Sequence, residues 1–195
     1  MTALTAAILI SGRGSNMEAL LDAAIPTIRF TRVVSNRADA AGLERAAERG
    51  VEALCVPSKG RSREAFEADL TQAVQDVDML CLAGFMRVLS ARFVAAWSGR
   101  MINIHPSLLP AYPGLEPQAR ALADGVAESG CTVHWVTPDV DAGPIILQER
   151  VPVLPGDTVE SLSNRILAAE HRCYPRAAAM AAETVAGTAL AKGHA

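Results

Sequence analysis

The stretch that decides the fold is Met101-Ile102-Asn103-Ile104-His105-Pro106, which continues as Ser-Leu-Leu-Pro to residue 110. Its alternation of apolar and polar residues has a period of two and predicts a strand over 101–105, with Asn103 and His105 on one face. Pro106 disfavours a helical conformation for His105, so we expect the strand to end there. Ligands of open α/β sheets bind beyond the carboxyl ends of the strands. The pair is therefore a candidate site, although a hydrogen-bonded core histidine is an equally good interpretation of this stretch alone.

Upstream of this strand, short apolar runs alternate with segments of helical periodicity. Strands are predicted at 6–10, 30–34, 51–56, 79–82 and 101–105, and helices around Met17–Leu21, around Leu43–Ala46 up to Gly50, over 63–77 and over 89–97. This alternation is typical of a mostly parallel sheet with helices on both faces.

Downstream, the pattern changes. A helix is predicted over 116–124, and strands over 131–136 and 145–153 that can pair antiparallel at the edge of the sheet. A last helix is expected to start with Asp157 as N-cap and to run to about Tyr174, where Pro175 kinks or ends it. The sequence thus predicts an α/β fold, a Rossmann-like three-layer open sheet that is parallel in its N-terminal half and has antiparallel strands added in its C-terminal half.

Composition limits the classes of function. The chain has 195 residues, of which 50% are hydrophobic, with a net charge of −3 and a pI of about 5.8. This length suits one domain, and the acidic balance argues against binding nucleic acid through a broad basic face. The four cysteines form no CxxC pair and the four histidines lack metal-ligand spacing, so we expect buried free thiols and no metal. The chain shows no signal peptide and no membrane span, which predicts a cytoplasmic protein.

Two glycine-containing turns follow predicted strands. Ser11–Asn16 would present backbone N–H groups and a helix N-terminus, which suit a phosphate. It lacks the lysine of a P-loop, and a tight strand–helix turn is the alternative. Ala83–Leu89 would place apolar side chains at the same edge, where they could line a flat apolar pocket, although this stretch alone slightly favours helix-entry packing.

Two further segments carry carboxylates. Asp139–Pro144 has too few ligands for calcium, and its two acids can turn the chain or orient a distant base. Glu170-His171 lies on the last predicted helix, where a solvated face is the usual explanation of such a pair.

Together these segments resemble the folate-dependent phosphoribosylglycinamide formyltransferases of purine biosynthesis. The matching pieces occur in family order over nearly the whole chain: SGRGSN (11–16), SNRADAAGLERA (35–46), SREAF (62–66), LAGFMRVLS (82–90), INIHPSLLPAYPGL (102–115), VDAGPIILQ (140–148) and AEHRCYP (169–175). The resemblance implies that 1–187 form a single catalytic domain. Its nucleotide-binding half is about 1–100, its folate and catalytic half is about 101–187, and 188–195 form a mobile tail.

The resemblance also implies roles for individual residues. The catalytic residues would be Asn103, His105 and Asp141. The phosphoribosylglycinamide substrate would contact Gly12, Arg13, Gly14, Ser15, Asn16 and Glu170. The folate would contact Arg63, Met86, Arg87, Val88, Leu89, Asn103, Thr137, Pro138, Asp139, Val140 and Asp141.

The implied co-substrate is 10-formyltetrahydrofolate, and the implied partners are small molecules, with neither nucleic acid nor membrane. A monomer and a homodimer both stay open. Family members often carry histidines after the PGL, in a pattern like HTHRQAL, where this chain has Glu116-Pro117-Gln118. The alternative functions are a formyltetrahydrofolate hydrolase and a non-catalytic folate- or nucleotide-binding module; formyltransferases acting on an amino sugar or an initiator tRNA are longer.

The implied reaction has a simple electrostatic requirement. When an amine attacks the formyl carbon, negative charge develops on the formyl oxygen. Asn103 would donate an N–H to it, and a protonated His105 would add a charge-assisted hydrogen bond. The Asp141 carboxylate would favour the imidazolium form and fix the orientation of the ring.

Overall fold

The computed structural model describes residues 3–192, with side chains as far as Thr188. It contains seven strands and six helices in that range, alternating along most of the chain. In order they are β1 (Leu4–Ile10), α1 (Ser15–Asp22), β2 (Ile28–Ser35), α2 (Ala41–Glu48), β3 (Glu52–Cys55), α3 (Arg63–Val74), β4 (Met79–Leu82), α4 (Ala91–Ala96), β5 (Met101–His105), α5 (Pro117–Ala123), β6 (Glu128–Trp135), β7 (Ile145–Pro152) and α6 (Val159–Lys192).

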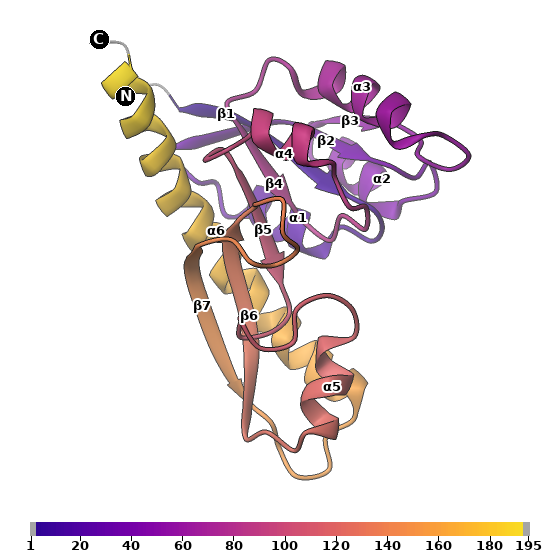
Figure 1. Cartoon of the computed structure of the whole chain (residues 1–195), viewed down its shortest axis with the longest axis vertical. Coiled ribbons are helices and arrows are strands. Elements are labelled where there is room, and N and C mark those ends of the chain that lie inside the picture. Colours follow the sequence, from indigo (N-terminus) through magenta and orange to yellow (C-terminus); the bar gives the residue numbers. More distant parts are fainter. Residues whose placement is uncertain (1–2, 193–195) are drawn as a thin grey trace.

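All seven strands form one sheet in the order β3-β2-β1-β4-β5-β6-β7. The first five are parallel, β6 pairs antiparallel with β5, and β7 pairs antiparallel with β6 at the edge. Figure 1 shows β6, β7 and α5 extending away from the parallel part, with α6 running along the length of the molecule. The predicted fold class is confirmed, including the antiparallel addition.

The period of two along β1 separates two cores. Ala6, Ile8 and Ile10 face a core that includes side chains of α1, α2 and α6, whereas Ala7 and Leu9 face one that includes side chains of α3 and α4. Because both faces are covered, the central strands are almost entirely apolar. This packing gives the sheet a rigid carboxyl edge on which loop residues can be held.

The start of the last helix differs from the prediction. Thr158, not Asp157, is the cap: the Thr158 Oγ1 accepts a hydrogen bond from the Ser161 N–H, and the Ser161 Oγ accepts one from the Thr158 N–H. Asp157 instead accepts hydrogen bonds from the Leu154 N–H and from the guanidinium of Arg165. Its carboxylate therefore fastens the turn before α6 rather than the first helical turn.

The end of the last helix also differs. The helix continues through Pro175 to Lys192, so residues 188–192 of the predicted tail are helical. Their mobility stays a prediction, and 193–195 lie outside the described residues. Among the described helices none is long and apolar enough to cross a membrane. Cys55 is exposed, contrary to the expectation of four buried thiols, while Cys81, Cys131 and Cys173 are buried.

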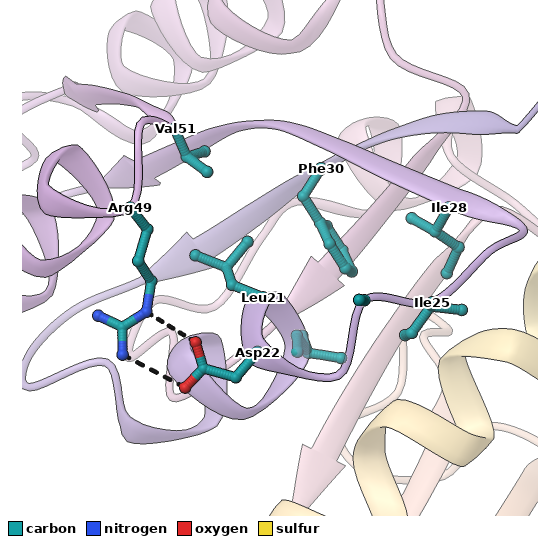
Figure 2. A pocket seen from close by; sticks show the side chains of 9 residues that line it. Leu21, Asp22, Ile25, Ile28, Phe30, Arg49 and Val51 are labelled. Carbon is teal, nitrogen blue, oxygen red and sulfur yellow. Dashed lines mark hydrogen bonds and ion pairs between the residues drawn. The ribbon is translucent and has the colours of Figure 1, made fainter.

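A hollow of about 390 Å³ lies at the opposite, amino-terminal edge of the strands. Figure 2 shows it between the end of α1, the start of β2 and Val51, with an ion pair between Asp22 and Arg49 at its rim. None of the residues with a predicted role lines it.

Thr132, a fully buried residue of β6, anchors the loop that follows β5. Its Oγ1 donates to the Ser107 carbonyl and accepts hydrogen bonds from the Leu109 N–H and the Gln148 side chain. This single hydroxyl therefore pairs with two backbone groups of that loop and with the Gln148 side chain on β7.

Replacement of Thr132 by valine is expected to destabilise the fold by about 2 kcal/mol, because it leaves buried polar groups unpaired while conserving shape. The urea midpoint should fall with the m-value unchanged. Thr184→Val, at an exposed position on α6, is the matched control and should leave the midpoint in place. An unchanged midpoint for Thr132→Val would contradict the anchoring role.

Candidate active site

His105 lies at the carboxyl end of β5, where the sequence analysis places it, and contacts Asp141 from the loop between β6 and β7. The His105 Nδ1 is 3.3 Å from the Asp141 Oδ2, and both side chains are about nine-tenths buried. Asp141 has a positive φ of 53°, an unusual conformation for a non-glycine residue. The tight turn at Asp141 is thus part of what brings its carboxylate back to the sheet.

The segment after β5 closes over this pair. The His105 Nε2 is 2.9 Å from the Tyr112 carbonyl oxygen, and the Gly114 N–H donates to the Asp141 Oδ2 at 2.8 Å. A carbonyl and a carboxylate can only accept, so both ring nitrogens of His105 face acceptors. The Nε2 contact is a hydrogen bond when that nitrogen carries a proton, and the contact with Asp141 is an ion pair when the ring is protonated.

The electrostatics of Asp141 combine opposing effects. Burial alone would raise the pKa of this carboxyl. The contact with His134, the hydrogen bond from Gly114 and the electrostatic effect of the two neighbouring imidazole rings outweigh burial and hold the pKa below its usual range. The carboxylate is therefore ionised at neutral pH.

Asn103 does not touch His105 or Asp141 through a hydrogen bond among the described residues; its partner is His134. The two residues lie directly opposite each other in the β5–β6 ladder, and the Asn103 Nδ2 is 3.2 Å from the His134 Nε2. The same His134 nitrogen is 3.6 Å from the Asp141 Oδ1. That distance is too long for a hydrogen bond, so it is an electrostatic contact.

The turn Ser11–Asn16 lies at the carboxyl end of β1 and leads into α1. Gly14 adopts a positive φ of 79°, and its backbone packs so closely on Gly42 that an added side chain would be crowded. Gly42 also donates its N–H to the Gly12 carbonyl. The turn thus has fixed geometry and places the first N–H groups of α1 at the edge of the sheet.

Asn16 links this turn to Glu170 on α6, since its Nδ2 donates to the Glu170 Oε2 at 2.8 Å. Glu170 is only 6% exposed, so the expectation of a solvated face is wrong. Burial raises the pKa of Glu170 to about 7, against the opposing effect of the Asn16 hydrogen bond. The Asn16 Oδ1 is buried with no hydrogen-bond partner among the described residues.

The segment Ala83–Leu89 lies next to that turn. The Met86 N–H donates to the Ser11 Oγ at 2.7 Å, and Ser90 is bound by the Glu67 carboxylate of α3. Met86 and Val88 are 73% and 64% exposed, so they form an apolar surface beside the site, while Leu89 is buried. Arg87 lies over the Phe66 ring at 6.0 Å.

The remaining predicted residues are more peripheral. Arg63 begins α3 and is exposed; over the described range its side chain makes no hydrogen bond or ion pair. Asp139 and Val140 are exposed, and Thr137 bonds the Asp139 carbonyl within the loop that ends at Asp141. Glu116 caps α5 with a positive φ of 53° and no side-chain hydrogen bond to the helix, which starts one residue later than predicted.

Sequence reasoning missed His134 and the Tyr112 and Gly114 backbone groups. The alternation of Thr132 and His134 along β6 is a signal for a shared face, but only the register with β5 shows that His134 meets Asn103. In the part of the chain that the structure describes, no three His, Cys, Asp or Glu side chains come close enough to hold a metal ion.

Comparisons with known proteins identify the family of the chain. Residues 4–178 match the family described as "Formyl transferase". A curated relative from Escherichia coli (strain K12), "Phosphoribosylglycinamide formyltransferase", is 46% identical over 86% of this chain and 82% of its own length. The solved structure of "glycinamide ribonucleotide transformylase 1" from Symbiobacterium toebii superposes with a TM-score of 0.89 at 52% identity, covering 93% of this chain and 88% of that one.

A longer relative matches as well. The "Trifunctional purine biosynthetic protein adenosine-3" of Drosophila melanogaster is 51% identical over 94% of this chain. The chain spans only 14% of that protein's length, so the match concerns one part of it.

Proposed function

The chain belongs to the formyl transferase family, and on that premise we propose that it transfers the formyl group of 10-formyltetrahydrofolate to the amine of phosphoribosylglycinamide. The observation that carries the proposal is the buried cluster at the end of β5, in which His105 contacts Asp141 and Asn103 lies on the same strand face. The cluster holds an amide donor and an imidazole next to a fixed carboxylate. These are the groups that formyl transfer to an amine requires.

The chemistry follows from where charge develops. The substrate amine attacks the formyl carbon, its carbonyl oxygen becomes negative, and the bond from that carbon to the folate nitrogen then breaks. The amine loses a proton and the folate nitrogen gains one, with His105 or a bound water carrying it. Asn103 stabilises the oxyanion with an N–H, and His105 adds a charge-assisted hydrogen bond.

The Tyr112 carbonyl modifies the expected role of His105. It accepts the hydrogen of Nε2, while Asp141 faces Nδ1, so both ring nitrogens are engaged. For His105 to donate to the formyl oxygen, that oxygen must take the place of the Tyr112 carbonyl. The segment 111–114 then has to move away from the ring when the substrate is bound.

The two substrates would lie on either side of this cluster. The turn Gly12–Asn16 would bind the phosphate, and Glu170 would contact the glycinamide substrate. The exposed apolar side chains of Met86 and Val88 fit the flat ring of the folate. Residues 1–187 would act as one catalytic domain in the cytoplasm, as a monomer or a homodimer.

A direct assay tests the proposal. Purified protein is mixed with 10-formyltetrahydrofolate, with and without phosphoribosylglycinamide, and release of tetrahydrofolate is followed. Release only in the presence of the amine supports the transferase. Equal release without it indicates a hydrolase, and no release indicates a binding module.

Replacement of Asn103 by alanine is expected to lower kcat about 100-fold, because one donor to the developing oxyanion is lost. The KM values should change by less than about threefold, since the interaction forms mainly in the transition state. Steady-state kinetics with each substrate varied in turn provide the measurement. Asn164→Ala, at an exposed position on α6, is the control. A change confined to KM would contradict a catalytic role.

A further inference from the structure

We propose that His134 is a positioning residue that fixes the orientation of the Asn103 carboxamide, an inference that rests on the proposed function. The imidazole of His134 is 3% exposed, whereas Asn103 is partly exposed at the end of β5. Of the two side chains, Asn103 is the more accessible one. His134 can therefore influence the reaction through its contact with Asn103.

The backbone determines which nitrogen of His134 carries the proton. The Nδ1 is 2.9 Å from the carbonyl oxygen of Trp135, which can only accept a hydrogen bond. The proton of the neutral ring is therefore on Nδ1, and Nε2 has a free lone pair. That lone pair faces the Asn103 Nδ2, 3.2 Å away, which can only donate.

This arrangement distinguishes the two ends of the carboxamide. With Nδ2 toward His134, one N–H is bound and the other remains available on the substrate side. A rotation of the amide by 180° would bring its oxygen against the lone pair of Nε2, which is repulsive. His134 thus keeps the Asn103 nitrogen directed to the donor position that the oxyanion requires.

The surroundings of His134 hold the Trp135 carbonyl in place. Gly143 packs so closely that a side chain there would overlap this carbonyl oxygen, and the Trp135 N–H donates to the Pro144 carbonyl. The β6–β7 register also shifts between Val133 and His134, a bulge of the kind that re-aims side chains near functional sites. The fold therefore fixes the orientation of the His134 ring and its hydrogen-bond partners.

The experiment is a double-mutant cycle on the full-length protein with both substrates. His134→Ala is expected to lower kcat about tenfold, an effect of the size measured for coupled residues in direct contact. Both KM values should stay within about twofold of the wild-type values. In the Asn103→Ala background, the same change should have no further effect. His134→Gln should recover most of kcat because its Oε1 can accept at the position of Nε2. His134→Asn is too short for this contact and should not recover it.

A second readout does not depend on activity. The ¹⁵N chemical shifts of the histidine rings, assigned by comparison with His134→Gln, should show His134 protonated on Nδ1 alone. Thermal melting of each variant is the control that tests whether it is folded.

The outcomes separate the two proposals. A wild-type protein without amine-dependent transfer refutes the proposed function, and the ring tautomer still tests the inference. An active wild-type protein in which His134→Ala lowers kcat equally in both backgrounds refutes the inference alone. A ring protonated on Nε2, or an effect confined to KM, also overturns it.

Discussion

Replacement of Asp141 by asparagine is expected to lower kcat by about 1,000-fold while leaving the fold intact. The asparagine can still accept the hydrogen bond from the Gly114 N–H through its oxygen. It removes the charge that faces the His105 Nδ1, so the imidazolium loses its counter-charge and its orientation. Both the charge-assisted hydrogen bond to the oxyanion and the proton carrier are affected together, which is why the expected loss exceeds that for Asn103.

The matched control is Asp22→Asn at the amino-terminal edge of the sheet (Figure 2). The Asp22 carboxylate is also ion-paired, and the hydrogen bond from Arg49 lowers its pKa. It lies at the far end of α1 from the turn Ser11–Asn16, so turnover should stay within about twofold. A kcat for Asp141→Asn near that of the wild type at neutral pH would rule out the proposed role of the carboxylate.

The sheet was predictable because its signals are local. Apolar runs such as 79–82 and the alternation in 101–105 need no knowledge of neighbours to indicate strands. The start of β6 was missed because Glu128-Ser129-Gly130 has the composition of a turn. Gly130 lies in the strand for a tertiary reason, since a side chain there would overlap the Glu149 carbonyl of β7.

The length of α6 also depends on tertiary contacts that local sequence signals do not reveal. Pro175 lacks an N–H and ends many helices, and the sequence offers no local compensation. The compensation is tertiary: Ala177, Ala178, Ala181 and Ala182 are buried in the core, and the Tyr174 hydroxyl donates to the Leu82 carbonyl. Packing of this face holds the helix together beyond the proline.

For the candidate site, the sequence predicted residues but not all of their partners. The sequence predicts that Asn103 and His105 share a face because both lie on one strand. His134 is 31 residues away and meets Asn103 only because β6 returns antiparallel beside β5. The contacts of His105 and Asp141 with Tyr112 and Gly114 are made by backbone groups, which carry no residue-type signal.

Replacement of Glu170 by glutamine is expected to stabilise the protein by on the order of 3 kcal/mol above pH 7. Burial raises the pKa of Glu170 from its ordinary value to about 7, so the folded state binds a proton more tightly than the unfolded chain. Folding stability therefore falls as the pH rises from about 4.3 to 7, and the whole loss of folding free energy caused by ionising Glu170 is present above that range. Below about pH 4, both states are protonated and the wild type and the variant should be equally stable.

The side chain of Asn16 gives this prediction a structural basis. Its Nδ2 already donates to Glu170, while its buried Oδ1 has no partner among the described groups. A protonated Glu170, or a glutamine in its place, carries a hydrogen-bond donor that the carboxylate lacks. Urea unfolding at pH 4, 6 and 8 should show a difference in the free energy of unfolding between Glu170→Gln and the wild type that grows with pH. Glu183→Gln, on the exposed side of α6, should show no such difference.

An ionisable group that destabilises the fold in this way is expected to serve substrate binding, so the stabilised variant should also have a raised KM for phosphoribosylglycinamide at pH 8. Stabilisation without that rise in KM would show that Glu170 has no part in binding. A stability difference between variant and wild type that narrows as the pH rises would contradict the raised pKa of Glu170.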